Sequence, residues 1–564
     1  MTLRSLLLAS ALLLAPLSPP AQAQGLSGPY LAARIAGYAN DYSAAATYYD
    51  TLLARGADTL RILENAVVIY AATGDFDRAT RAADRMQELG LASQFADGAR
   101  LVTLLRDGAY DDALALIDDD GVGGALLDGL LRGWIAIGQG QVAEGLSQFD
   151  TLAETDGFAQ IAYLHRAYAL AMSGDYEGAD EILSGRAHGA LGMSTRGIEA
   201  QAQVLMQLDR RDDALDLLGQ ANDVTNSPVL QSLQQRIEAG ETIPYDFITQ
   251  APDGIAEAYF MLAAIFAGDT SSTFTLLAAR SAIELRPGHI DALVLTAELL
   301  DEQGQYDLAN AVLNTVPRDH PSFFGAEITR ANVLSASGKD DAAVEVLSAL
   351  TKSHADQQTV WAAYGDTLRQ LDRFAESAQA YDRAIEMIEI ESPRDWYLHY
   401  VRGITFERTE RWDQAEADFR RALELNPDQP QVLNYLGYGL VEKRVKLDEA
   451  LGMIEEAVAA RPTDGYITDS LGWVYYRLGR YEEAVAPMER AAELEPRDPI
   501  INDHLGDVFW TVGRKREAEF QWRRALSLDP EEEDADRIRR KIEVGLDTVL
   551  EEEGGAGPLE AAKD

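Results

Sequence analysis

A repeat of about 34 residues runs along most of this chain and constrains its fold more than any other feature. In the clearest copies an aromatic residue is followed three residues later by alanine, as Tyr42 is by Ala45 and Phe76 by Ala79. The position of this aromatic residue within the repeat recurs at residues 42, 76, 110, 142, 176, 211, 272, 306, 340, 374, 412, 447, 481 and 515. Most of these steps are equal, and the longest separates positions 211 and 272. Such a period predicts stacked structural repeats.

The unit Gly465–Pro496 indicates what the repeated residues do. Gly472 and Ala484 are small, which lets two antiparallel helices approach closely where they cross. Gly479 permits the turn between the helices, and Pro496 ends the second helix. Each unit is therefore predicted to be a helix–turn–helix pair.

These motifs resemble the tetratricopeptide repeat, a helix–turn–helix unit of about 34 residues. The likeness is stronger from Ile290 to Pro530 and weaker from Tyr30 to Leu218, where the leading Leu-Gly is lost. It implies an all-α fold, namely a superhelical solenoid of stacked antiparallel helix pairs with a C-terminal capping helix. A helical array of another repeat family is the alternative.

The spacing also predicts the order of segments along the chain. The step from Arg211 to Ser272 is much longer than one repeat and contains several Pro and Gly residues, so it marks a junction. Beyond Pro530, Ile538 and Ile542 share a helical face, as expected of a capping helix. The predicted segments are a signal peptide at 1–23, a divergent N-terminal array at 24–219, an irregular junction at 220–254, a C-terminal array at 255–530, a capping helix at 531–553 and a flexible tail at 554–564.

The N-terminus has the pattern of a secretory signal peptide. Arg4 supplies positive charge, Leu6–Leu14 is an apolar run, and Ala21–Ala23 fits a cleavage site between small residues. The run is shorter than the ~20 residues that span a bilayer, although an uncleaved anchor is the alternative. No later segment is apolar for long enough to cross a membrane. The mature protein is expected to be soluble and periplasmic or secreted, and without cysteine it is expected to carry no lipid anchor.

Charge and motif content exclude several functional classes. Asp and Glu number 93 against 49 Lys and Arg, which gives a net charge of −44. Such a surface repels phosphate, so nucleic acid and anionic lipid are not expected partners. The seven histidines are scattered, no cysteine is present, and no nucleotide-binding or nucleophile motif occurs. The sequence therefore predicts a protein that is not an enzyme and that holds no metal or cofactor.

The resemblance implies that the first helices of successive units line a concave groove, with places 2, 5, 9, 12 and 13 of each unit facing it. Large aromatic residues on such a face offer contact area at little entropic cost, while Asn434, Asp469 and Asp503 can hydrogen-bond an extended backbone. Packing of the aromatic residues against one another is the alternative. The predicted partner-binding residues are Tyr397, Tyr400, Asn434, Tyr438, Tyr466, Asp469, Trp473, Tyr476, Arg477, Asp503, Asp507 and Trp510.

Three stretches of the C-terminal half, Asn434–Tyr438, Asp469–Tyr476 and Asn502–Asp507, resemble proteobacterial envelope tetratricopeptide proteins. That group includes adaptors that dock a carboxyl-terminal processing protease and deliver its substrates. Those adaptors carry a lipidated cysteine, which this sequence lacks, and the groove aspartates make an acidic C-terminal tail a poor ligand. The resemblance implies an exported scaffold for envelope proteins or peptides. A glycan-handling scaffold for peptidoglycan or exopolysaccharide is the alternative.

Overall fold

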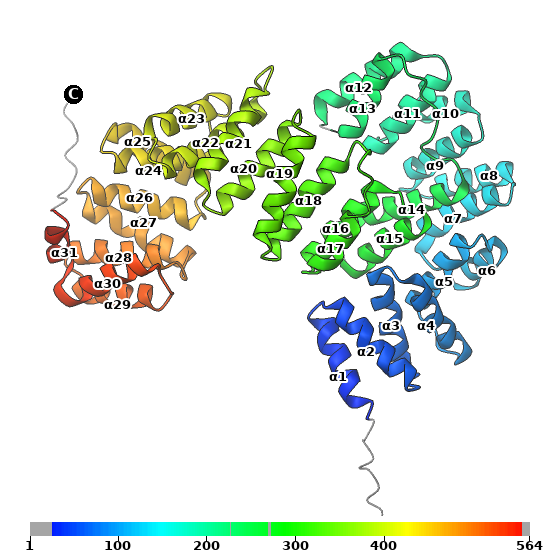
Figure 1. Ribbon diagram of the computed structural model, residues 1–564, viewed down its shortest axis with the longest axis horizontal. Coiled ribbons are helices and arrows are strands. Elements are labelled where there is room, and N and C mark those ends of the chain that lie inside the picture. Colours follow the sequence, from blue (N-terminus) through cyan, green and yellow to red (C-terminus); the bar gives the residue numbers. More distant parts are fainter. Residues whose placement is uncertain (1–24, 226, 269–271, 555–564) are drawn as a thin grey trace, which may run out of the picture. The chain divides into compact units, whose positions relative to one another are not determined.

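The computed structural model describes residues 25–225, 227–268 and 272–554, and all regular structure within these ranges is helical (Figure 1). The predicted all-α fold of stacked helix pairs is confirmed. The predicted signal peptide lies outside the described residues, as does the predicted tail after Gly554. Within the described ranges, no helix is both long enough and apolar enough to cross a bilayer.

The chain divides into two compact units, residues 1–338 and 339–564. The helices of the first unit are α1 Ser27–Tyr38, α2 Tyr42–Ala54, α3 Leu60–Thr73, α4 Phe76–Glu88, α5 Gln94–Arg106, α6 Tyr110–Asp120, α7 Gly124–Gly138, α8 Val142–Ala153, α9 Ala159–Met172, α10 Tyr176–Leu183, α11 Thr195–Gln207, α12 Arg211–Val224, α13 Pro228–Glu238, α14 Ala251–Phe266, α15 Ser272–Leu285, α16 Ile290–Glu302, α17 Tyr306–Leu313 and α18 Phe323–Ala336.

The second unit contains one short 3-10 helix among its α-helices. Its elements are α19 Asp340–Ser353, α20 Gln358–Gln370, α21 Phe374–Glu386, η1 Pro393–Asp395, α22 Trp396–Arg408, α23 Trp412–Leu425, α24 Pro430–Glu442, α25 Leu447–Ala460, α26 Gly465–Arg477, α27 Tyr481–Leu494, α28 Pro499–Thr511, α29 Lys515–Leu526, α30 Glu532–Val544 and α31 Leu546–Glu552.

A glycine in the first helix of a pair faces a large side chain of the second helix, and this contact recurs along the chain. A β-carbon at Gly506 would lie 2.4 Å from the Trp522 ring, and one at Gly403 would lie 2.7 Å from Phe419. Such distances are too short for any other residue, so glycine sets the spacing of the two helices. The other pairs of this kind are Gly133 with Phe149, Gly365 with Tyr381, Gly437 with Ile454 and Gly472 with Met488.

In the first unit, the pair α14–α15 returns to earlier helices of the chain. Helix α14 contacts α7 and α9, and α15 contacts α3 and α5 (Figure 1). A β-carbon at Gly254 of α14 would lie 2.3 Å from the buried ring of Trp134, which shows how closely α14 approaches α7. Arg280 of α15 is buried and donates a hydrogen bond to the Ala72 carbonyl at 3.0 Å. The helices on both sides of the predicted junction therefore belong to the first unit.

The predicted junction at 220–254 contains a regular helix, α13, followed by a non-helical segment that leads into α14. The Gln203 carboxamide oxygen accepts from the backbone N–H groups of Asp246 and Phe247 at 3.0 and 3.1 Å. At the start of α14, the Asp253 carboxylate and the Gln250 side chain form a capping box. The irregular segment is therefore fixed by side chains at both of its ends.

The C-terminal cap differs from the single helix predicted at 531–553. It consists of α30 and α31, which are separated by Gly545 at a φ of 88°. A β-carbon there would lie 2.6 Å from the Trp510 ring. The left-handed conformation and the close approach both require glycine, so the chain breaks its helix at this residue.

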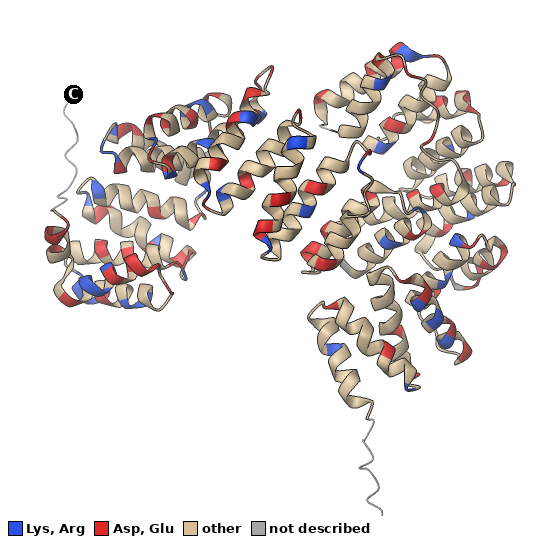
Figure 2. Ribbon diagram, viewed as in Figure 1, with Lys and Arg blue, Asp and Glu red and all other residues tan. Residues whose placement is uncertain are grey.

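The first helix pair contains very few charged residues. Helix α1 contains only Arg34 and α2 only Asp50, and both helices are nearly uncoloured in Figure 2. Three apolar side chains of α1, Leu31, Ile35 and Tyr38, are exposed. This end of the first unit therefore lacks the polar outer face that usually terminates a repeat array.

We expect Gly506→Ala to destabilise the second unit by about 1–3 kcal/mol, because the new methyl group overlaps the Trp522 ring. The matched control is Gly452→Ala on α25, where a β-carbon meets no atom within 4 Å, so it should be neutral or slightly stabilising. Urea unfolding followed by tryptophan fluorescence checks both variants, since six of the seven tryptophans lie after residue 339. Equal stability of the two variants would contradict the spacing role of glycine.

Candidate functional site: an aromatic surface in the second unit

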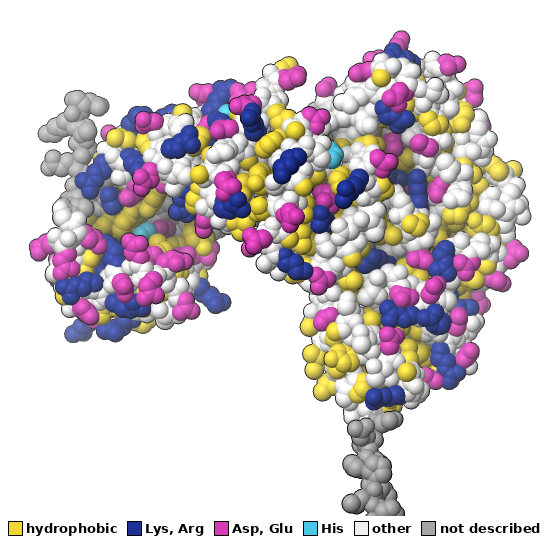
Figure 3. Space-filling view, viewed as in Figure 1, with side chains coloured by type: hydrophobic (Ala, Val, Ile, Leu, Met, Phe, Trp, Pro, Cys, Tyr) yellow, Lys and Arg dark blue, Asp and Glu magenta, His cyan; other side chains and the backbone are white. Residues whose placement is uncertain are grey.

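The first helices of the last four full pairs, α22, α24, α26 and α28, carry the predicted groove residues. Helix α26 contacts α24 on one side and α28 on the other, and Tyr400 of α22 packs against Tyr435 of α24, so these first helices form one continuous row. Figure 3 shows hydrophobic side chains gathered in a hollow near α26 and α28. We call this row of first helices the aromatic surface.

One aromatic cluster covers the part of this surface nearest α22. The ring centroids of Trp396 and Tyr400 lie 5.9 Å apart, those of Tyr397 and Tyr400 lie 6.5 Å apart, and those of Tyr400 and Tyr435 lie 5.6 Å apart. Tyr397 and Tyr435 each retain 41% exposure, so the cluster is held together internally while part of it remains accessible.

A second cluster lies where α26 faces α28. The Trp473 ring stacks on His504 at a centroid distance of 4.0 Å and on Tyr476 at 4.9 Å. His504 also pairs with the Asp469 carboxylate, with Nδ1 at 3.0 Å from Oδ2. Trp473 is consequently buried, with 9% exposure, and its ring is engaged by neighbours of its own chain.

The same cluster contains a titratable imidazole beside its aromatic rings. Burial lowers the pKa of His504, but the Asp469 carboxylate more than offsets this effect, so the net pKa lies above 6.5. The carboxylates of Asp503 and Asp507 raise that pKa further. On the α24 side, Glu442 lies 3.4 Å from Trp473 Nε1 and 3.6 Å from the Arg477 guanidinium.

Helix α30 covers the C-terminal end of the surface with a buried lysine. Lys541 Nζ lies 2.7–2.9 Å from both carboxylate oxygens of Asp503 and of Asp507, and Trp522 donates to Asp507 at 2.9 Å. Arg537 approaches the same two carboxylates at 3.8 and 3.7 Å. Burial and repulsion by Asp507 raise the pKa of Asp503 to about 6, although Lys541 opposes that rise.

The described part of the chain contains no group of three or more His, Asp or Glu side chains arranged to hold a metal ion. The geometry of the aromatic surface is that of a contact surface: exposed rings supported by packed rings and by internally paired charges.

Family models described as tetratricopeptide repeat match residues 30–91, 130–183, 291–322, 328–395, 396–429 and 442–499. Together these ranges cover more than half of the chain. The protein belongs to the tetratricopeptide repeat (TPR) family.

A TPR repeat-containing protein of Pseudomonas aeruginosa, PA4667, is 28% identical over 186 residues, which is 33% of this chain and 29% of that relative. This TPR protein therefore spans less than a third of the length of that relative. Among solved structures, a chain of the APC/C hetero-tetramer Cut9–Hcn1 is similar at 15% sequence identity and a TM-score of 0.39. The match covers 93% of the present chain and 97% of that chain. YrrB, described as a TPR protein with an unusual peptide-binding site, matches 35% of this chain and 99% of its own at 17% identity, with a TM-score of 0.28.

The twelve predicted partner-binding residues of the TPR protein fall into three groups by exposure. Two are exposed, namely Tyr397 and Tyr466. Six are half-buried: Tyr400, Asn434, Tyr438, Tyr476, Arg477 and Trp510. Four are buried: Asp469, Trp473, Asp503 and Asp507. Their role in binding stays a prediction.

The buried aspartates have partners inside the TPR protein. Asp469 pairs with His504, while Asp503 and Asp507 pair with Lys541. The expectation that these carboxylates select against an acidic ligand therefore loses its basis, because their charges are balanced within the fold.

Sequence reasoning missed His504, Lys541 and Tyr435. His504 follows Asp503 directly, so its position on helix α28 could have been predicted from the sequence. Its pairing with Asp469 of α26 could not, because that contact depends on the stacking of two repeats. Lys541 lies two helices beyond Asp507, and no local pattern links them. These contacts are determined by tertiary packing.

We expect Lys541→Met to destabilise the second unit by about 3–5 kcal/mol, because two buried carboxylates lose the ammonium group that hydrogen-bonds to both of them. Lys443→Met is the matched control, since Lys443 is exposed on the same unit. Urea unfolding monitored by tryptophan fluorescence measures both. Adding Asp503→Asn and Asp507→Asn to Lys541→Met should recover part of the loss. Equal stability of the two lysine variants would show that this ion pair does not hold α30.

The raised pKa of His504 predicts a pH-dependent change in the fluorescence of Trp473. A protonated imidazole quenches an indole on which it stacks, so emission should rise as His504 loses its proton above pH 6.5. The ion pair with Asp469 is fully formed below the unfolded pKa of histidine and is lost as pH rises through the higher folded value, so stability falls over the same range. A fluorescence titration checks this, with His504→Gln as the control that should remove the step. A step that persists in His504→Gln would assign it to another group.

Proposed function

We propose that this protein is an exported, non-enzymatic adaptor that binds extended segments of cell-envelope proteins on the aromatic surface. The observation that carries the proposal is the exposure of large aromatic rings on the first helices. Tyr397 is 41% exposed and its ring contacts that of Tyr400, while Tyr466 is 57% exposed. Rigid aromatic side chains of this kind dominate the binding energy of many protein interfaces.

Export is supported by the sequence pattern of residues 1–23. The resemblance of Asn434–Tyr438, Asp469–Tyr476 and Asn502–Asp507 to envelope adaptors supports a carboxyl-terminal processing protease, or a substrate delivered to it, as the partner. Because the buried aspartates are neutralised within the fold, we propose that the bound segment is mostly uncharged and presents apolar or aromatic side chains to the surface.

The glycan-handling alternative requires open aromatic faces, because a sugar stacks flat on a ring. The Trp473 ring already stacks on Tyr476 and His504, which disfavours that alternative at this residue. Tyr397 and Tyr466 serve both hypotheses, so an experiment must separate them.

A site-specific crosslinker tests the proposal. With p-benzoylphenylalanine in place of Tyr466, the mature chain should crosslink to a protein in envelope extract. The matched control places the same group at Phe520, which is 63% exposed on the second helix α29 and should give little product. Crosslinking to peptidoglycan or another glycan would support the alternative. Equal yields at both positions would overturn a role for the aromatic surface.

The double substitution Tyr397→Ser and Tyr466→Ser should weaken binding of the captured partner at least tenfold, since truncating an interface aromatic residue often costs more than about 1 kcal/mol. Both side chains are exposed, and circular dichroism verifies that the variant remains folded. Titration of the purified partner by calorimetry measures the affinity. Unchanged affinity would exclude both residues from the binding site.

A further inference from the structure

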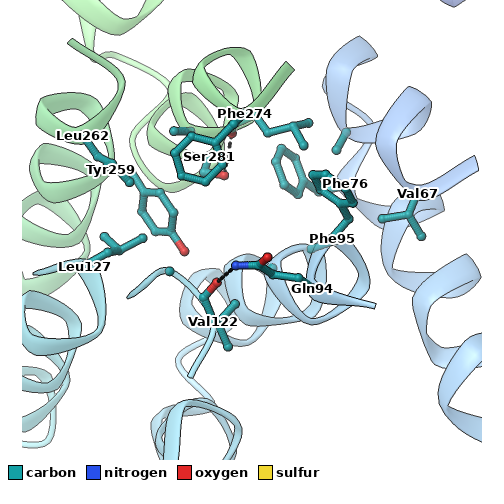
Figure 4. A pocket seen from close by; sticks show the side chains of 16 residues that line it. Val67, Phe76, Gln94, Phe95, Val122, Leu127, Tyr259, Leu262, Phe274 and Ser281 are labelled. Atoms are coloured by element: carbon teal, nitrogen blue, oxygen red, sulfur yellow. Dashed lines mark hydrogen bonds between the residues drawn. The ribbon is translucent and has the colours of Figure 1, made fainter. Parts of the chain in front are cut away.

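A cavity of about 150 Å³ lies in the first unit, where α14 and α15 pack against the earlier helices, and the exposed side chains of Gln94 and Phe95 border it (Figure 4). Its wall is formed by side chains of α3, α4, α5, α7, α14 and α15 and by the loop before α7. Four aromatic rings line it, those of Phe76, Phe95, Tyr259 and Phe274. All of its lining residues are uncharged.

One polar group in this cavity has no hydrogen-bond partner among the described residues. Tyr259 is 6% exposed, and its hydroxyl, which no hydrogen bond engages, points into the space between Leu127 and Gln94 in Figure 4. The two other polar side chains of the wall are engaged. Gln94 donates to the Val122 carbonyl at 3.2 Å, and Ser281 donates to the Leu277 carbonyl at 2.8 Å. The described part of the chain supplies no acceptor for this hydroxyl, which faces the cavity, so it is available to donate to an acceptor on a ligand.

We propose that this cavity binds a small uncharged aromatic molecule that carries one hydrogen-bond acceptor, which receives the Tyr259 hydroxyl proton. The volume sets the size, because a cavity of about 150 Å³ lined by apolar side chains holds a benzene ring. The absence of charged lining residues disfavours ions, since a buried unpaired charge is costly. The surrounding rings favour an aromatic ligand through edge and offset contacts.

The ligand would touch both α14–α15 and the early helices α3 and α5. These helices are joined by side-chain packing, by the Arg280 hydrogen bond to Ala72 and by the ion pair of Arg106 with Glu284 at 2.6 Å. Binding would therefore stabilise the closed arrangement of the first unit. The cavity belongs to a different unit from the aromatic surface, so this inference does not depend on the proposed adaptor function.

Two probes of nearly identical shape test the proposal on the full mature chain. Acetophenone carries a carbonyl acceptor, and α-methylstyrene replaces that oxygen with a CH₂ group. Calorimetry should show acetophenone binding about fivefold more tightly than α-methylstyrene, because only the ketone accepts the Tyr259 hydrogen bond. Tyr259→Phe should make the two affinities equal by weakening acetophenone alone.

A cavity-filling variant establishes where the probes bind. A β-carbon at Gly98 on the cavity wall meets no atom within 4 Å, so Gly98→Leu should fill the space without a clash and abolish binding of both probes. The matched control is Gly219→Leu on α12, where a β-carbon also meets no atom within 4 Å and which does not line the cavity. It should leave both affinities unchanged.

Three results would overturn the proposal. These are no binding of either probe at millimolar concentration, equal affinity for the two probes in the unaltered chain, and binding that survives Gly98→Leu. None of these results affects the crosslinking experiment at position 466. Failure of the cavity proposal can therefore be distinguished from failure of the proposed adaptor function.

Discussion

The close approach of two helices at a glycine is the constraint on which the rest of this structure depends. At Gly506 and Gly403 the first helix offers bare backbone, and Trp522 or Phe419 of the second helix fills the space. The contact fixes the spacing within a pair and so directs the remaining faces of the first helix outward. Because the same contact recurs along the chain, successive first helices form the row that carries the aromatic surface.

In each unit, later helices cover part of the earlier ones. In the first unit, α14 and α15 pack on α3, α5, α7 and α9, leaving a small apolar cavity with the Tyr259 hydroxyl inside it. In the second unit, Lys541 of α30 pairs with Asp503 and Asp507 and buries both carboxylates. A charge of this kind is stable in the interior only because it is paired and hydrogen-bonded. The exposed rings that remain on the aromatic surface are those on α22, α24 and α26.

These two features suggest different kinds of ligand for the two units. The aromatic surface combines exposed tyrosines with rings held by internal contacts, which suits an extended chain laid across several helices. The cavity of the first unit is lined by several helices and has one unsatisfied donor, which suits a compact molecule. One fold thus offers a broad contact surface and a separate small site, since a row of helices is open while a folded-back pair encloses space.

The sequence by itself determined the helical pairs and their antiparallel packing, because a period of about 34 residues with small residues at the crossing admits few other folds. It also identified Tyr397 and Tyr466, whose exposure follows from their place within one helix. Tertiary structure alone decided that Asp503, Asp507 and Trp473 are buried, that α14–α15 returns to α3–α9, and that the cap breaks at Gly545. The reason is physical: the repeat encodes contacts between neighbours in sequence, whereas Lys541, His504 and Trp134 act through contacts between elements that only packing brings together.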